Sequence, residues 1–278
     1  MREGGHRLSA VTDHGSPLLE LRGIEKRYGA VRALAGVDFD VRAGEVVALA
    51  GDNGAGKSTL VKVITGVGPA DAGEIAFDGR PVRIATPHDA ATLGVAAVYQ
   101  DLALCDNLDV VANLFLGREE RRGGPRGPLD GIAMEQRAGE LLASLSIGNL
   151  DDVRREVGTM SGGQRQSVAI TRALLGDAQL VVLDEPTAAL GVVQTEQVLA
   201  LVRRLRDRGL GVVLVSHNLA DVFAVADRIA VLRLGRNAGV FPADPVRRAE
   251  VVAAITGVSG DLTPAATSAV APADEERS

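Results

Sequence analysis

VVALAGDNGAGKS, residues 46–58, consists of five apolar residues, a glycine-rich turn and a Lys-Ser pair. The apolar residues predict a buried strand, and the residues after the pair, 59–64, predict a helix. The turn fits the pattern G-x-x-x-x-G-K-S/T of a phosphate-binding P-loop, in the required context of a strand before it and a helix after it. The pattern is short enough to arise by chance, so the remainder of the sequence has to support it.

The glycines and the Lys-Ser pair of this turn suit a polyphosphate. Glycine takes positive φ and lacks a Cβ, so successive N–H groups can turn inward, and the helix start adds unpaired N–H groups and a positive dipole end. Lys57 is a mobile cation for the outer phosphates, and the Ser58 hydroxyl is a hard oxygen ligand suited to Mg²⁺. The alternative is an ordinary strand-to-helix turn with a surface lysine. The expected nucleotide-binding residues of the turn are Gly51, Asp52, Asn53, Gly54, Ala55, Gly56, Lys57, Ser58 and Thr59.

Composition indicates a globular chain of one large domain or two small ones. Of its 278 residues, 46% are hydrophobic but only 3% aromatic, which suits parallel strands buried on both faces. The net charge of −6 argues against a general nucleic-acid binder, and the single Cys105 fits a reducing compartment. The sequence has no signal-peptide pattern and no apolar run near the roughly 18 residues of a membrane span. We therefore expect a cytoplasmic protein that reaches a membrane only through a partner.

Hydrophobic patterning predicts one domain, residues 17–258, between a disordered leader, 1–16, and a disordered tail, 259–278. An antiparallel β portion is expected around the P-loop strand, a mostly helical insertion at about 101–175, and alternating strands and helices after it. The expected strands are 18–24, 37–41, 180–183, 212–215 and 227–234, with a hairpin over 74–82 turning at Asp78-Gly79. The expected helices are 102–116, 134–145, 198–205 and 245–255, with a loop over 117–131. This order predicts an α/β fold with a P-loop NTPase core, a mostly parallel sheet, an antiparallel β subdomain and a helical insertion.

Two carboxylates follow the predicted strand 180–183. Asp184 and Glu185 would lie at the C-terminal end of a buried strand, where such sheets bind their ligands. Asp184 can hold Mg²⁺ directly or through water, while Glu185 can polarise the water that attacks a γ-phosphate. The alternative is a solvated turn that ends a strand. The P-loop nearby favours the functional interpretation.

A second anion-seeking helix start is predicted at Ser161-Gly162-Gly163-Gln164. Ser161 is a good N-cap for the helix that follows, and the two glycines allow close backbone approach. The alternative is a serine cap with a flexible neighbour. Because the chain has one P-loop but two such helix starts, one of them would serve a nucleotide held by another subunit.

Ser161-Gly162-Gly163-Gln164 resembles the signature of the ABC ATPases. The likeness of the chain to this family runs from about residue 18 to residue 257. Gln100 matches the family's Q-loop glutamine, which touches Mg²⁺ or attacking water and senses a transmembrane partner. His217 matches the switch histidine at the γ-phosphate, and Tyr28 matches the aromatic residue that stacks on adenine. The resemblance therefore implies catalytic roles for Glu185, His217 and Gln100, nucleotide contacts at Tyr28 and at residues 161–164, and Mg²⁺ ligands at Ser58, Asp184 and Gln100. Taken singly, each residue has a structural alternative: a half-buried ring, a helix cap or a strand-end polar group.

A narrower resemblance is to the ATP-binding subunits of bacterial ribose, xylose and fructose importers. The segments that carry it are 51–59, 99–104, 113–119 and 186–192. Met160 replaces the usual Leu, a volume-conserving change. Gly191 stands where the D-loop usually has Asp, so a cross-subunit role of that carboxylate is not carried over. Many ATPases of this type also fuse two halves in one chain, whereas this chain has one half.

The resemblance implies a subunit that hydrolyses ATP, with Mg²⁺, to drive monosaccharide import. Its expected partners are transmembrane permease subunits, a second copy or a second ATPase chain and, indirectly, a periplasmic or lipoprotein solute-binding protein; no nucleic acid is expected. It would lie on the inner face of the cell membrane through the permease. One alternative is a soluble ABC ATPase acting on nucleic acid or ribosomes, although this chain has neither paired halves nor Cys clusters. Another is a regulatory subunit that binds ATP and scarcely hydrolyses it.

Overall fold

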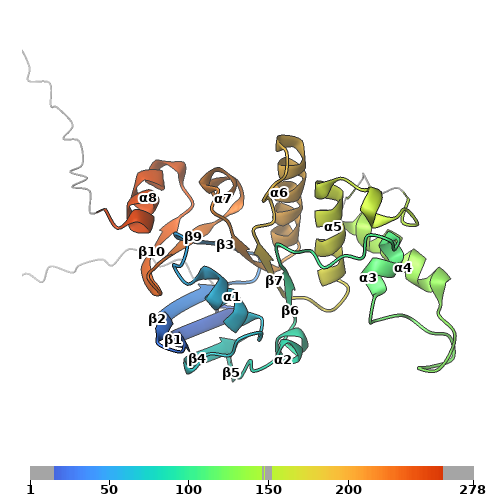
Figure 1. The fold of residues 1–278 in the computed structure, drawn as a ribbon, viewed down its shortest axis with the longest axis horizontal. Helices are drawn as coiled ribbons and strands as arrows, with labels where there is room; N and C mark the ends of the chain where they lie inside the picture. Colours follow the sequence, from blue (N-terminus) through green and yellow to red (C-terminus); the bar gives the residue numbers. More distant parts are fainter. Residues whose placement is uncertain (1–15, 146, 148–151, 259–278) are drawn as a thin grey trace, which may run out of the picture.

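The computed structural model describes residues 16–145, 147 and 152–258. The predicted tail and nearly all of the predicted leader lie outside these residues. Figure 1 shows two β regions in contact, with helices α3, α4 and α5 gathered at one end and α7 and α8 near the other. Within the described residues, no helix combines the length and the apolar character needed to cross a membrane.

The larger sheet has six strands in the order β10-β9-β3-β8-β7-β6. All neighbouring pairs are parallel except β10 and β9, so the predicted mostly parallel sheet is confirmed. Its strands are β3 (Val46–Ala50), β6 (Val95–Val98), β7 (Leu180–Asp184), β8 (Gly211–Val215), β9 (Arg228–Arg233) and β10 (Arg236–Pro242). Strands β3 and β8 are buried along their whole length, as expected for parallel strands covered on both faces.

The two faces of this sheet carry different layers. One face packs against α1 (Lys57–Ile64) and the smaller sheet, through one continuous apolar cluster. The other face packs against helices in two further clusters. The helices of that side include α5 (Gly162–Ala173), α6 (Val192–Asp207), α7 (Leu219–Val225) and α8 (Arg248–Thr256). The short helix α2 (Pro87–Thr92) leads into β6.

The antiparallel portion is a separate four-stranded sheet, ordered β2-β1-β4-β5. The predicted antiparallel β subdomain is therefore confirmed, and it covers one face of the P-loop strand instead of pairing with it. Its strands are β1 (Leu19–Tyr28), β2 (Val31–Val41), β4 (Ala72–Phe77) and β5 (Arg80–Val82). The predicted hairpin turn at Asp78-Gly79 is confirmed, with both residues at positive φ.

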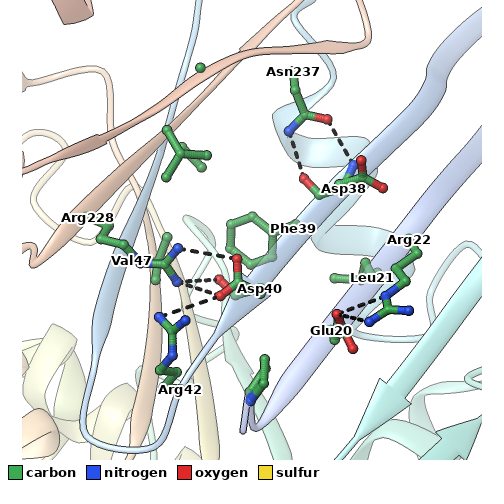
Figure 2. Close-up of a pocket in the computed structure, with 14 residues that line it drawn as sticks. Glu20, Leu21, Arg22, Asp38, Phe39, Asp40, Arg42, Val47, Arg228 and Asn237 are labelled. Carbon is green, nitrogen blue, oxygen red and sulfur yellow. Dashed lines mark hydrogen bonds and ion pairs between the residues drawn. The ribbon is translucent and has the colours of Figure 1, made fainter. Parts of the chain in front are cut away.

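Polar contacts join this sheet to the larger one in a groove that Figure 2 shows. Asn237 of β10 accepts from the backbone N–H of Asp38 at 2.9 Å and donates to its carbonyl at 2.7 Å. Arg228 of β9 donates to the Asp40 carboxylate at 2.7 Å and also pairs with Glu45. The positive charge of Arg228 is thus paired with the carboxylates of Asp40 and Glu45, and these contacts hold the two sheets together at the groove.

The helical portion contains α3 (Val110–Phe115), α4 (Gly131–Ser144), a short 3₁₀ turn at Val157–Thr159, and α5. The predicted helix over 102–116 is wrong for its first half, because α3 begins only at Val110. Asn113 explains this, because its side chain bonds both backbone groups of Cys105 and the carbonyls of Leu108 and Asp109, which holds the preceding segment in a non-helical turn. Asp109 then caps α3 by accepting from the N–H of Ala112.

Candidate active site

The P-loop joins β3 to α1, and its shape is held by neighbouring backbone. A Cβ on Gly51, at φ +151°, would lie 2.3 Å from the Leu232 carbonyl oxygen of β9. A Cβ on Gly56, at φ +107°, would lie 2.9 Å from the Ala33 carbonyl oxygen of β2. Both contacts exclude any larger residue, so the glycines are required by packing as well as by backbone conformation.

The start of α1 is open. Its N-cap, Gly56, has a left-handed conformation, and no side chain caps the helix. Lys57 extends across the loop and donates to the carbonyls of Gly51 at 2.7 Å and Asp52 at 3.0 Å. The first turn therefore presents backbone donors, a helix dipole and a cation at one place, which is an anion-binding arrangement.

Two acidic residues, Asp184 and Glu185, lie at the C-terminal end of β7, which β8 separates from the P-loop strand β3. Asp184 ends β7, opposite Val215 of β8. Burial raises the pKa of the Asp184 carboxyl above its usual range, the charge of Glu185 adds to this shift, and Lys57 opposes it. A divalent cation would stabilise the ionised carboxylate in the same way as Lys57, so this carboxyl suits a metal ligand.

Glu185 and His217 are in contact. His217 Nδ1 lies 2.8 Å from Glu185 Oε2, while the His217 side chain is otherwise 73% exposed. Glu185 has a left-handed φ of 51°, and its N–H donates to the carbonyl of Val215. The structure thus joins a carboxylate and an imidazole above the ends of β7 and β8. The pairing was not predicted.

Gln100 and Glu185 line one hollow, together with Gly162 and Leu190. Gln100 is exposed just beyond the C-terminal end of β6. Tyr28 lies at the end of β1, 47% exposed, with the Lys26 ammonium 5.7 Å from its ring centre. Its hydroxyl approaches Gly68, which follows the C-terminal end of α1.

The predicted cap of α5 is confirmed. Ser161 Oγ accepts from the N–H of Gln164, and Gln164 Oε1 accepts from the N–H of Ser161 at 3.0 Å, which forms a capping box. Ser161 and Gly162 are exposed, whereas Gly163 is buried. Figure 1 places α5 well apart from α1 within the chain. Gly162, at the start of α5, lines the hollow that also contains Gln100 and Glu185.

Three further contacts near these residues were not predicted. Gln194 of α6 packs on Gly163, where a Cβ added to the glycine would lie 2.9 Å from the Cβ of Gln194. The Oε1 of Gln194 also lies 2.5 Å from the position that a Cβ on Gly191 would take. Thr187 donates to Asp221 at 2.7 Å, and both residues are buried. These partners lie far apart in sequence or have no distinctive pattern, so no motif indicated them.

The fold and this site define a P-loop nucleotide-binding ATPase. The family description "ABC transporter" matches residues 34–188 of the chain. The chain belongs to the ABC transporter family, and its fold is that of the ATP-binding cassettes.

Several known relatives carry names from sugar import. The chain is 45% identical to the fructose import ATP-binding protein FrcA of Rhizobium meliloti, over 87% of this chain and 94% of that protein. It is 46% identical to the xylose/arabinose import ATP-binding protein XylG of Sulfolobus acidocaldarius, over 80% and 86%. A ribose import ATP-binding protein, RbsA 2 of Burkholderia pseudomallei, is 43% identical, and the chain spans about half its length, 48%.

Solved structures agree on the fold. A nucleotide-free ATP-binding cassette matches with a TM-score of 0.74 at 26% identity, over 87% of this chain and 96% of that one. A cassette in its ADP conformation matches with a TM-score of 0.74 at 27% identity, over 87% and 100%. A dimeric cassette in a post-hydrolysis state with ADP and Pi matches with a TM-score of 0.66 at 25% identity, over 81% and 99%.

Proposed function

We propose that this chain is the ATP-hydrolysing subunit that powers a membrane permease for monosaccharide import. The observation that carries the proposal is its 45% identity with a fructose import ATP-binding protein over nearly the whole of both chains. Fructose, xylose/arabinose and ribose all occur in the names of its relatives, which supports the class of solute and leaves the individual sugar to experiment. The permease would hold the chain at the inner face of the cell membrane, and a periplasmic or lipoprotein solute-binding protein would act with it indirectly.

The P-loop residues would bind the nucleotide. The N–H groups of residues 51–59 would surround the β- and γ-phosphates, and Lys57 would exchange its two carbonyl partners for phosphate oxygens. Tyr28 would stack on adenine, for which its exposed ring is suited.

Mg²⁺ fits the residues present. Among the described residues, no group of three or more His, Cys, Asp or Glu side chains is placed to hold a metal ion. Mg²⁺ in nucleotide sites needs no such group, because phosphates and water supply most of its ligands. Ser58, Asp184 and Gln100 would supply the protein oxygens, and Mg²⁺ would neutralise charge on the phosphates.

Glu185 would accept a proton from the attacking water, which makes it the general base. His217, hydrogen-bonded to Glu185 at 2.8 Å, would orient that carboxylate and contact the γ-phosphate. Gln100 lines the same hollow as Glu185, so it would reach the same water. These groups act by positioning and by charge neutralisation, the main contributions to phosphoryl-transfer catalysis.

A second chain would complete each site. In a head-to-tail pair, the open start of α1 in one copy would lie opposite the capped start of α5, residues 161–164, of its partner. A homodimer supplies two complete sites by symmetry, and a different ATPase chain is the other possible partner. The dimeric cassette with ADP and Pi supports this arrangement.

The test compares the wild-type chain with Lys57→Ala. The chain is isolated from membranes with its partners, which are identified, and uptake of fructose, xylose and ribose is measured in cells with each version. We expect a permease among the partners, and in the variant a loss of ATP turnover of roughly 10²–10³-fold, with uptake lost alongside. Wild-type turnover in Lys57→Ala would overturn the site, and uptake that is independent of the chain would overturn the transport role.

A further inference from the structure

The segment that follows Gln100 is held by α5. Residues 102–104 have no helical or strand structure, and Ala103 has a left-handed φ of 49°. Arg172 of α5 donates to the Ala103 carbonyl at 2.6 Å and to the Leu102 carbonyl at 2.7 Å. A guanidinium is a planar fork of donors, so it can hold two successive carbonyls in one fixed orientation.

A second arginine of α5 contacts the same segment. Arg165 donates to Asp106 at 2.6 Å. Arg165 and Arg172 are seven residues apart, which is close to two helical turns, so both lie on one face of α5. Leu102 and Leu104 also pack against the apolar cluster that contains Ala169 and Ile170 of α5. This face of α5 therefore carries the segment through polar and apolar contacts together.

Loss of the two carbonyl partners of Arg172 would be energetically costly. Its guanidinium is half-buried, and no carboxylate among the described residues lies within ion-pair distance of it. Burial lowers the pKa of Arg172, and the nearby charge of Arg118 adds to that shift. The two carbonyls are therefore what compensates for removing this charge from water. If the segment turned away, a half-buried cation would lose its partners, which is a costly change.

We infer that Arg172 is a positioning residue that fixes the segment after Gln100 to α5, so that Gln100 and residues 161–163 move as one unit. The helix that Arg172 belongs to begins at the Ser161–Gln164 capping box, and the segment it holds begins two residues after Gln100. This inference rests on the proposed function, because it takes Gln100 to act on the nucleotide of its own chain and residues 161–163 to contact the nucleotide of the partner chain. A displacement of Gln100 by a permease would then reach the residues that face the partner's nucleotide.

The test uses the full-length chain with Arg172→Gln and Arg172→Lys. Hydrogen–deuterium exchange is followed in peptides covering residues 101–106, without nucleotide and with MgATP. We expect exchange there to be at least about tenfold faster in Arg172→Gln, because its shorter amide cannot bond both carbonyls. Arg172→Lys should lie between, since an ammonium can keep one carbonyl. If Arg172→Gln fails to fold, the comparison of Arg172→Lys with wild type decides.

Steady-state ATP turnover supplies a readout that general loss of stability would not reproduce. Misplacement of Gln100 should lower kcat by about ten- to hundredfold while the KM for ATP stays within about twofold, because the P-loop is untouched. The control is Arg204→Gln, which removes another arginine–carbonyl bond, from α6 to Leu145 at 2.8 Å, and leaves both bonds from Arg172 to residues 102 and 103 in place. It should leave exchange at 101–106 and kcat near wild type.

Unchanged exchange at 101–106 in both Arg172 variants would overturn the inference, as would an equal fall of kcat in Arg204→Gln. Absence of MgATP hydrolysis by the wild-type chain and its permease would instead overturn the proposed function. The exchange measured without nucleotide would still test the link between Arg172 and the segment, so the two failures are distinguishable.

Discussion

The two helix starts that we propose to face phosphate, at α1 and at α5, are built in opposite ways. The start of α1 has glycine as its N-cap and no capping side chain, whereas the start of α5 is closed by a reciprocal Ser161–Gln164 capping box. An uncapped start leaves its N–H groups for a ligand, while a capped start has already satisfied part of its donors. The difference shows that the α1 end can bind an anion by itself, and that the α5 end is suited to complete a site made mainly by another surface.

The largest effect is expected from Glu185→Gln, which should trap an ATP-bound dimer. In that dimer the α1 start of one chain and the α5 start of the other would contact the same nucleotide. Removing the general base should lower turnover by roughly 10²–10⁴-fold while ATP remains bound. Size-exclusion chromatography with light scattering should then detect a dimer that depends on MgATP. The double variant Lys57→Ala with Glu185→Gln is the control and should stay monomeric. If Glu185→Gln stays monomeric at high concentration, even with its permease, then α5 does not complete the site.

A medium effect is expected from Ser161→Ala, which makes the α5 start resemble an uncapped one. Loss of the cap should cost about 1 kcal/mol and lower Tm by about 2–4 °C. ATP affinity of the monomer should not change, but the dimer should need a higher protein concentration. Asp130→Ala removes the cap of α4 and serves as the control, with a similar fall in Tm and normal dimer formation. Weaker ATP binding by monomeric Ser161→Ala would contradict the contrast between the two starts.

The smallest effect is expected from Gly191→Asp at a third helix start, that of α6, which also lacks a side-chain cap. Gly191 has an extended conformation that Asp accepts, and the nearest obstacle is the end of the Gln194 side chain, which can move. The new carboxylate should cap α6 and raise stability by a few tenths of a kcal/mol, measured by differential scanning calorimetry. Gly191→Ala is the matched control, because it adds a Cβ without an acceptor. A clear fall in stability only in Gly191→Asp would indicate that this start, like that of α1, does not tolerate a cap.

The sequence was sufficient for the parts of the site whose signals are local. The P-loop, the carboxylates after β7 and the Ser161 cap are each specified within about ten residues, and all three are found where they were expected. The alternation of strands and helices likewise predicted the mostly parallel sheet. The functional roles of these residues stay predictions until turnover is measured.

The failures have a common physical cause, which is competition from contacts that periodicity does not describe. The helix expected over 102–116 is interrupted because one amide, Asn113, bonds four backbone groups of the preceding segment. The strand expected over 227–234 was recognised, but its antiparallel neighbour β10 was not, because Gly239 and Pro242 weaken the strand pattern there. The link between Arg172 and Ala103 joins residues 69 positions apart, and no local pattern encodes it.

The clamping of Gly51 by β9 and of Gly56 by β2 has a thermodynamic consequence for ATP. Since neighbouring backbone maintains the curve of the P-loop, the loop already has its binding conformation before ATP binds. Binding therefore requires little ordering of the chain. Calorimetry on the isolated subunit should therefore record a small unfavourable configurational entropy and a small heat-capacity change. Large values of both belong to the later step, in which two subunits close on the nucleotide and remove their facing surfaces from water.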